Sequence, residues 1–129
     1  MAPARTAAYK DLLVAYAAAW NRHDLDAIMR MMTPDCVFDT SGGADPWGRR
    51  YAGQAAVRGA IVEILDTLPD VRFEEARHFT CGERGVSEWT MIATRSDGSR
   101  IESRGCDLFE FRAGKICRKD SYRKRRLPR

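Results

Sequence analysis

Apolar residues in the first half of the chain recur with a helical period. Over residues 6–21 they return at steps of three and four, which places them on one stripe of an amphipathic helix. The residues of this stripe are Tyr9, Leu12, Leu13, Tyr16 and Trp20. Asp24 is in position to cap a second, shorter helix that Pro34 is expected to end. A third helix is predicted over about 53–68.

The second half of the chain changes to the period of a β-strand. A short strand is predicted over 36–40, followed by a loop rich in Gly and Pro over 41–50. Beyond residue 70, alternating segments are separated by turn sequences; they cover about 71–80, 85–95, 100–112 and 115–123. Four strands joined by short turns predict an antiparallel meander. Together with three helices, this pattern predicts an α+β domain in which a curved sheet wraps around helices.

Length and composition indicate one globular domain over residues 1–129, with 44% hydrophobic and 31% charged residues. Neither a membrane-spanning run nor the apolar core of a signal peptide is found, so we expect a cytoplasmic protein without membrane contact. The four cysteines are too far apart for a metal or redox motif and are interpreted as reduced thiols, mostly in the core. The histidine spacing and the glycine pattern likewise predict no metal and no cofactor.

The net charge of +4 is concentrated at the end of the chain. Residues 112–129 carry nine Lys or Arg against one acid, so the remainder is mildly acidic. The basic tail, over about 123–129, could contact nucleic acid through release of counterions. Because no base-reading motif accompanies the tail, the pattern favours a solvated segment, and we expect no nucleic-acid partner.

Three polar side chains fall on apolar faces. Asp107 shares a strand face with Phe109 and Phe111, so its carboxyl group should face the core and be paired, hydrogen-bonded or protonated there. Asp39 ends the short strand, where a half-buried carboxylate suits a general base but can also simply open a turn. Tyr16 lies on the buried helix stripe, so its hydroxyl needs a partner or a cavity.

Five segments, taken in order, resemble one protein family. They are residues 16–26, 34–39, 51–58, 105–116 and 118–122. The resemblance is to the nuclear transport factor two-like superfamily, in its SnoaL-like branch of polyketide cyclases and ketosteroid isomerase relatives. It implies a cone-shaped, cystatin-like α+β barrel with a strongly curved, mostly antiparallel sheet. It also implies a deep hydrophobic pocket and a homodimer formed through the sheet.

The resemblance also implies roles for particular residues. Ketosteroid isomerases use a tyrosine on the first helix, an aspartate base at the end of the first strand and a neutral aspartic acid on a late strand. By local motif these roles fall on Tyr16, Asp39 and Asp107. The residues expected to contact the substrate are Trp20, Trp89, Phe109 and Tyr122.

The resulting hypothesis is a cofactor-independent isomerase, cyclase or lyase that acts on a small hydrophobic carbonyl compound. Asp39 would remove a proton, while Tyr16 and neutral Asp107 would donate hydrogen bonds to the enolate. The alternatives are a non-catalytic small-molecule-binding module or a dimerisation domain of the same fold. A less favoured alternative is an epoxide hydrolase using Arg104, Asp107 and Asp120.

Overall fold

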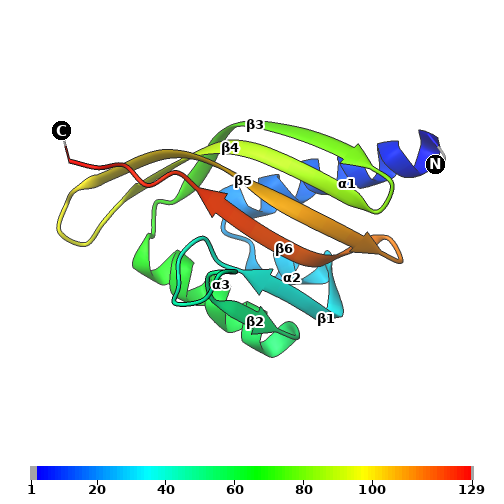
Figure 1. Cartoon of the computed structure of the whole chain (residues 1–129), viewed down its shortest axis with the longest axis horizontal. Helices are drawn as coiled ribbons and strands as arrows, with labels where there is room; N and C mark the ends of the chain where they lie inside the picture. The colour runs from blue at the N-terminus through cyan, green and yellow to red at the C-terminus, as the bar shows by residue number, and fades with distance from the viewer. Residues whose placement is uncertain (1–2, 129) are drawn as a thin grey trace.

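The computed structural model describes residues 3–128 and contains three helices and six strands in that part of the chain (Figure 1). In chain order they are α1 (Pro3–Asn21), α2 (Leu25–Arg30), β1 (Met32–Asp39), β2 (Arg50–Ala52), α3 (Gln54–Thr67), β3 (Arg72–Cys81), β4 (Arg84–Thr94), β5 (Arg100–Arg112) and β6 (Lys115–Arg123). The predicted α+β class is confirmed.

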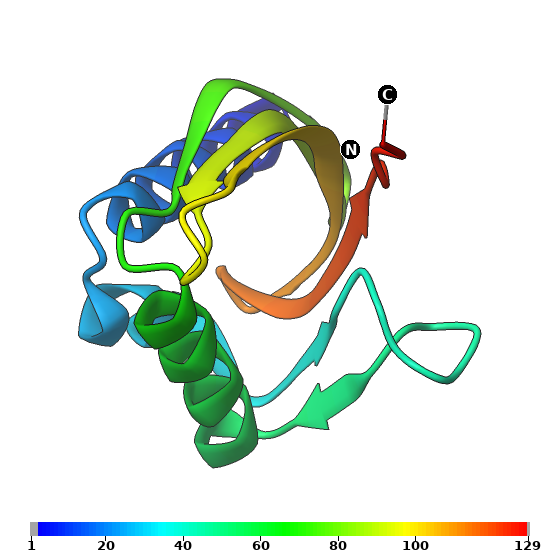
Figure 2. The same ribbon diagram turned by 90° about the vertical axis from the view of Figure 1, so that its left-hand side faces the viewer.

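All six strands form one curved sheet in the order β2-β1-β6-β5-β4-β3. Strands β3 to β6 form the predicted antiparallel meander, and only the β1–β6 pair is parallel. Figure 2 shows these strands curving around an interior, with α1 running beside β3 and α3 lying near β1 and β2. The sheet does not close on itself, because β2 and β3 remain as edges.

Helix α1 is attached to the inner face of the sheet by aromatic contacts. Tyr9 stacks on Phe111 with ring centroids 4.2 Å apart, and Tyr16 meets Phe109 edge-on at 5.7 Å. Each such pair contributes about 1 kcal/mol beyond the burial of its surface. The predicted helix stripe therefore does face the core, with Leu13 at 1% and Trp20 at 5% exposure.

The segment after α1 differs from the expectation at one point. Asp24 caps α2 as predicted, accepting a hydrogen bond from the backbone N–H of Ala27 at 3.1 Å. Pro34, however, does not end this helix, since α2 ends at Arg30 and Pro34 lies inside β1. A proline is tolerated there because the β1–β6 register is interrupted between Met32 and Val37, so no ladder hydrogen bond is required of it.

The cysteines also differ from the expectation. None of the four forms a disulfide, but only Cys36 is buried, so their interpretation as mostly core thiols is wrong. Cys81 ends β3 and is exposed, and Cys106 and Cys117 are half-buried. The alternation of β5 places Cys106 on the outer face of the sheet, since its neighbour Asp107 points inward. Within residues 3–128 no helix is long and apolar enough to cross a membrane.

Candidate active site

A small cavity lies between α1 and the inner face of strands β3 to β6. Its walls are formed by Leu13, Tyr16, Ala17, Trp20, Phe73, Ala76, His78, Ser87, Trp89, Asp107, Phe109 and Lys119. The cavity thus brings together Asp107 and four other residues expected at the site: Tyr16, Trp20, Trp89 and Phe109. The cavity volume is about 20 Å³, enough for one water molecule, and falls far short of the deep pocket that the resemblance implies.

The centre of this cavity is an ion pair between Lys119 and Asp107. The Lys119 Nζ atom lies 2.8 Å from a carboxylate oxygen of Asp107, and both residues are only 5% exposed. Trp89 Nε1 and Ser121 Oγ also donate hydrogen bonds to this carboxylate, at 3.0 and 2.5 Å. Asp107 is thus the shared acceptor of an ammonium, an indole N–H and a hydroxyl group. The geometry therefore does not support Asp107 as a neutral hydrogen-bond donor.

Aromatic rings surround the ammonium group of Lys119. Its Nζ atom lies 5.2 Å from the ring centroid of Phe38, 5.3 Å from Trp20, 5.8 Å from Phe109 and 6.0 Å from Tyr16. The negative faces of these rings attract a cation and replace part of its lost hydration. A positive charge is thereby held inside the protein at the wall of the cavity.

A row of polar side chains crosses four strands beside this pair. His78, Ser87, Asp107 and Ser121 are successive cross-strand partners on β3, β4, β5 and β6. His78 Nδ1 lies 2.7 Å from Ser87 Oγ. Burial, with a smaller contribution from the charge of Lys10, lowers the pKa of His78. The imidazole is therefore neutral near pH 7 and can accept a proton.

Tyr16 adds a hydroxyl to the same wall. It is 3% exposed and donates only to Met32 Sδ, at 3.7 Å, a weak acceptor. Burial raises the pKa of Tyr16, so the hydroxyl stays protonated over the physiological range. It can therefore act as a donor to a ligand in the cavity.

The cavity lies against an irregular part of the edge strand. The β3–β4 register shifts between Glu74 and Arg77, and Glu75 has φ 55°, a conformation that residues other than glycine seldom adopt. The next residue, Ala76, lines the cavity and is exposed. Bulges of this kind occur next to active sites, where they redirect side chains or end strand pairing. The bulge thus forms part of the cavity wall through Ala76.

Asp39 is not brought to this cavity. It is fully buried, but it lies on the outer face of the sheet, because its neighbour Phe38 points into the core. Arg50 donates to both of its carboxylate oxygens, at 2.8 and 3.0 Å, and Arg118 donates to one of them at 2.8 Å. The hydrogen bond to Asp39 raises the pKa of the Arg50 guanidinium. Asp39 thus joins β1, β2 and β6 and does not meet Tyr16 or Asp107.

Other expected site residues lie outside the cavity as well. Tyr122 is 53% exposed, and its hydroxyl donates to Asp120 at 3.3 Å, away from the cavity. Arg104 and Asp120 are on the outer face, so they do not converge with Asp107 as an epoxide hydrolase site requires. Among residues 3–128 no group of three His, Cys, Asp or Glu is placed to hold a metal ion.

Three polar residues of the cavity were not predicted from the sequence: Lys119, His78 and Ser87. Ser87 is the cross-strand partner of Asp107 on β4, and His78 is the partner of Ser87 on β3. Counting across the two predicted hairpins from Asp107 would therefore have identified both residues. The inward position of Lys119 is harder to predict from alternation, because the register of β5 and β6 shifts after Glu110 and leaves Cys117 unpaired.

Comparison with known proteins agrees with this architecture. Residues 13–119 match the family model of the SnoaL-like domain. The chain belongs to the SnoaL-like family. Its structure is similar to that of a candidate polyketide cyclase from Xanthomonas campestris pv. campestris, with a TM-score of 0.82 and 22% identity over 91% of this chain and 90% of that one.

Two further solved structures share the SnoaL-like fold of this chain. A candidate polyketide cyclase from Pseudomonas putida KT2440 has a TM-score of 0.78 and 20% identity, covering 92% of this chain and 91% of that one. An NTF2-like protein of unknown function from Mesorhizobium loti has a TM-score of 0.77 and 25% identity, covering 94% of each chain. No curated protein sequence matches.

Proposed function

We propose that this SnoaL-like protein is a cofactor-independent acid/base enzyme acting on a small carbonyl compound at the inner cavity. The observation that carries the proposal is the buried Lys119–Asp107 pair, enclosed by aromatic rings. A buried ion pair adds little to stability compared with apolar residues of the same size. Ionisable groups that are held in a partly enclosed site by burial and a specific partner are typical of active sites.

The proposed chemistry is a proton transfer next to a carbonyl group. Neutral His78 removes the proton, and the electron pair of the broken C–H bond moves onto the carbonyl oxygen as an enolate. The ammonium of Lys119 and the hydroxyl of Tyr16 stabilise this oxygen. The protonated imidazole then returns its proton to the same or a conjugated carbon atom. Asp107 is a positioning residue that orients Lys119, and Ser87 orients His78.

The second candidate is a small-molecule-binding module of the same fold. It is favoured by one observation: protein groups already occupy the carboxylates of both candidate catalytic aspartates, Asp39 and Asp107. For either function, a ligand larger than water must separate α1 from β3. Asn21 joins these elements by two hydrogen bonds with the backbone of Phe73, at 3.0 and 2.8 Å.

Exchange of α-protons into D2O tests the proposal. A panel of small cyclic ketones is incubated with the protein and followed by proton NMR. We expect catalysed exchange, with a loss of about a hundredfold in Lys119→Met and in His78→Gln. The matched control is Lys115→Met, which removes an exposed lysine at the start of β6 and should leave the rate unchanged.

The pH profile separates catalysis by His78 from a structural effect of its substitution. Because the pKa of His78 lies below its ordinary value, the rate should rise with pH on the acid side of neutrality and then level off. Ketones that bind to the protein without exchange would favour the binding module. Exchange that is unaffected by both substitutions would contradict the proposed site.

A further inference from the structure

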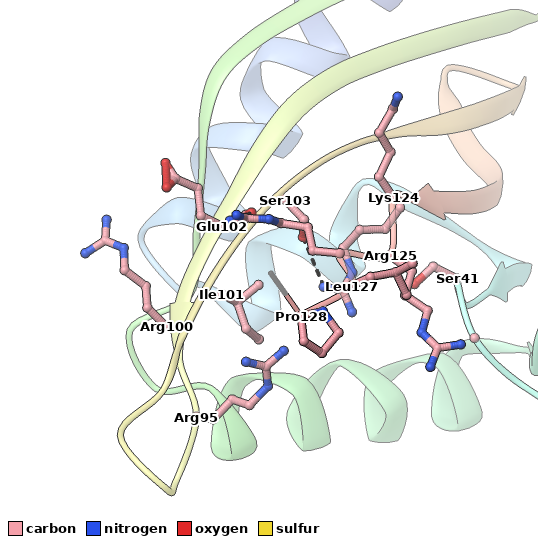
Figure 3. Close-up of a pocket in the computed structure, with 13 residues that line it drawn as sticks. Ser41, Arg95, Arg100, Ile101, Glu102, Ser103, Lys124, Arg125, Leu127 and Pro128 are labelled. Atoms are coloured by element: carbon pink, nitrogen blue, oxygen red, sulfur yellow. Dashed lines mark hydrogen bonds between the residues drawn. The ribbon is translucent and has the colours of Figure 1, made fainter.

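A second and much larger hollow lies at the other end of the sheet. It has a volume of about 670 Å³ and shares no residue with the inner cavity. Figure 3 shows the C-terminal segment 124–128 lying beside Ile101–Ser103, with Arg95 reaching toward it from the β4–β5 hairpin. Ser41 and Gly42 complete the walls. We call this hollow the basic groove.

The charge of the basic groove is strongly one-sided. Its only acidic lining residue is Glu102, against six cationic residues: Arg95, Arg100, Arg123, Lys124, Arg125 and Arg126. Within residues 3–128, none of these six takes part in an ion pair, whereas Arg50, Arg118 and Lys119 elsewhere on the sheet do. Unpaired cations gathered around one concave site create a positive potential that attracts anions.

Two of the arginines are held in place by neutral acceptors. Arg123 donates through Nη1 to Ser103 Oγ at 3.1 Å, and Arg126 donates through Nη1 to the backbone carbonyl of Glu102 at 3.2 Å. A backbone hydrogen bond of 2.9 Å, from the N–H of residue 124 to the carbonyl of residue 104, fixes the tail against β5. The tail beyond β6 therefore lies along the sheet as one wall of the groove. Arg129 lies outside the described residues.

Arg123 lies near a second cation of the groove, Arg95. Burial, together with the nearby charge of Arg95, lowers the pKa of the Arg123 guanidinium. A bound anion would offset this repulsion between like charges. The planar guanidinium group matches the oxygens of a phosphate group with two parallel hydrogen bonds.

We infer that the basic groove binds a compact ligand with several linked phosphate groups, such as a triphosphate chain. Its volume is in the range of small-molecule sites, and its cations come from two segments that face each other. Single-stranded nucleic acid is less well matched, because no aromatic residue lines the groove to stack on bases. This inference is independent of the proposed acid/base chemistry.

Calorimetric titration with inorganic tripolyphosphate tests the inference on the full chain. We expect saturable binding that weakens as salt is raised from about 50 mM to about 200 mM. The double variant Arg125→Gln/Arg126→Gln should bind at least about tenfold more weakly, and Arg95→Gln should also weaken binding. All of these side chains are exposed, so thermal unfolding should be unchanged. Arg84→Gln on the distant β3–β4 hairpin is the control for loss of a single charge and should bind like the unsubstituted protein.

Two competitors define what would overturn the inference. A butanetetracarboxylate of similar charge that binds as tightly as tripolyphosphate would indicate attraction to any anion. A short single-stranded oligonucleotide that binds more tightly per phosphate would indicate a nucleic-acid surface. The inference is also overturned if binding is absent, or if Arg84→Gln reduces binding as much as Arg95→Gln does.

Discussion

Removing the charge of Lys119 tests the most unusual feature of the interior. In Lys119→Met, the carboxylate of Asp107 keeps the hydrogen bonds from Trp89 and Ser121 but loses the cation 2.8 Å away. Both partners are 5% exposed, so bulk solvent compensates little for the lost partner. Breaking a buried pair on one side costs about 3–5 kcal/mol, and the free energy of unfolding should fall by that amount.

The double variant Lys119→Met/Asp107→Asn separates the interaction energy of the two residues from the effect of losing either one. It leaves no unpaired charge, and the side-chain amide introduced by Asp107→Asn can still accept a hydrogen bond from Trp89. Its loss of stability should therefore be smaller than that of Lys119→Met alone. Urea unfolding of the four proteins gives the coupling energy. If the two single losses simply add in the double variant, the buried ion pair is not present as described.

Three further predictions concern other parts of the molecule. Asp39→Asn should lower the free energy of unfolding by about 2 kcal/mol, because it weakens charge-assisted hydrogen bonds to two half-exposed arginines. Urea unfolding measures this loss, and Asp45→Asn in the exposed loop is the control. Because the pKa of Tyr16 is raised in the folded state, the unfolded chain releases this proton first, so stability should fall as pH rises above about 10. Tyr16→Phe should flatten that loss in unfolding experiments, and an unchanged slope would contradict the burial of the hydroxyl. We also expect a homodimer through the outer face of the sheet, where Phe79 is 57% exposed. Ultracentrifugation should show a dimer that Phe79→Glu dissociates. A 14.6 kDa species for the unsubstituted chain would contradict this expectation.

The periodicity of the sequence was sufficient to predict the α+β class and most of the helices and strands. The helix stripe from Tyr9 to Trp20 and the four alternating segments are governed by local geometry, and each matches the structure closely. The same alternation placed Asp107 correctly on the inner face beside Phe109. Strand β2 was not predicted, because its three residues owe their conformation to pairing with the end of β1.

The site was harder to predict, because the alignment of neighbouring strands decides which of its residues lie side by side. On β6, simple alternation groups Ile116 with Arg118, but the extra residue Cys117 shifts the register and turns Lys119 to the inside, opposite Phe109. On β1, Asp39 stands at the expected strand end, but the larger apolar residue Phe38 takes the inward position. The cavity volume depends on how the aromatic side chains pack, which no sequence pattern encodes.

The most direct test of the central claim is a crystal structure of the protein with a small cyclic ketone bound. We expect the carbonyl oxygen within hydrogen-bonding distance of Lys119 Nζ or Tyr16 Oη, and α1 displaced from the β3 bulge to make room. A ketone bound elsewhere, with the inner cavity unchanged and still closed around the Lys119–Asp107 pair, would contradict the proposed site.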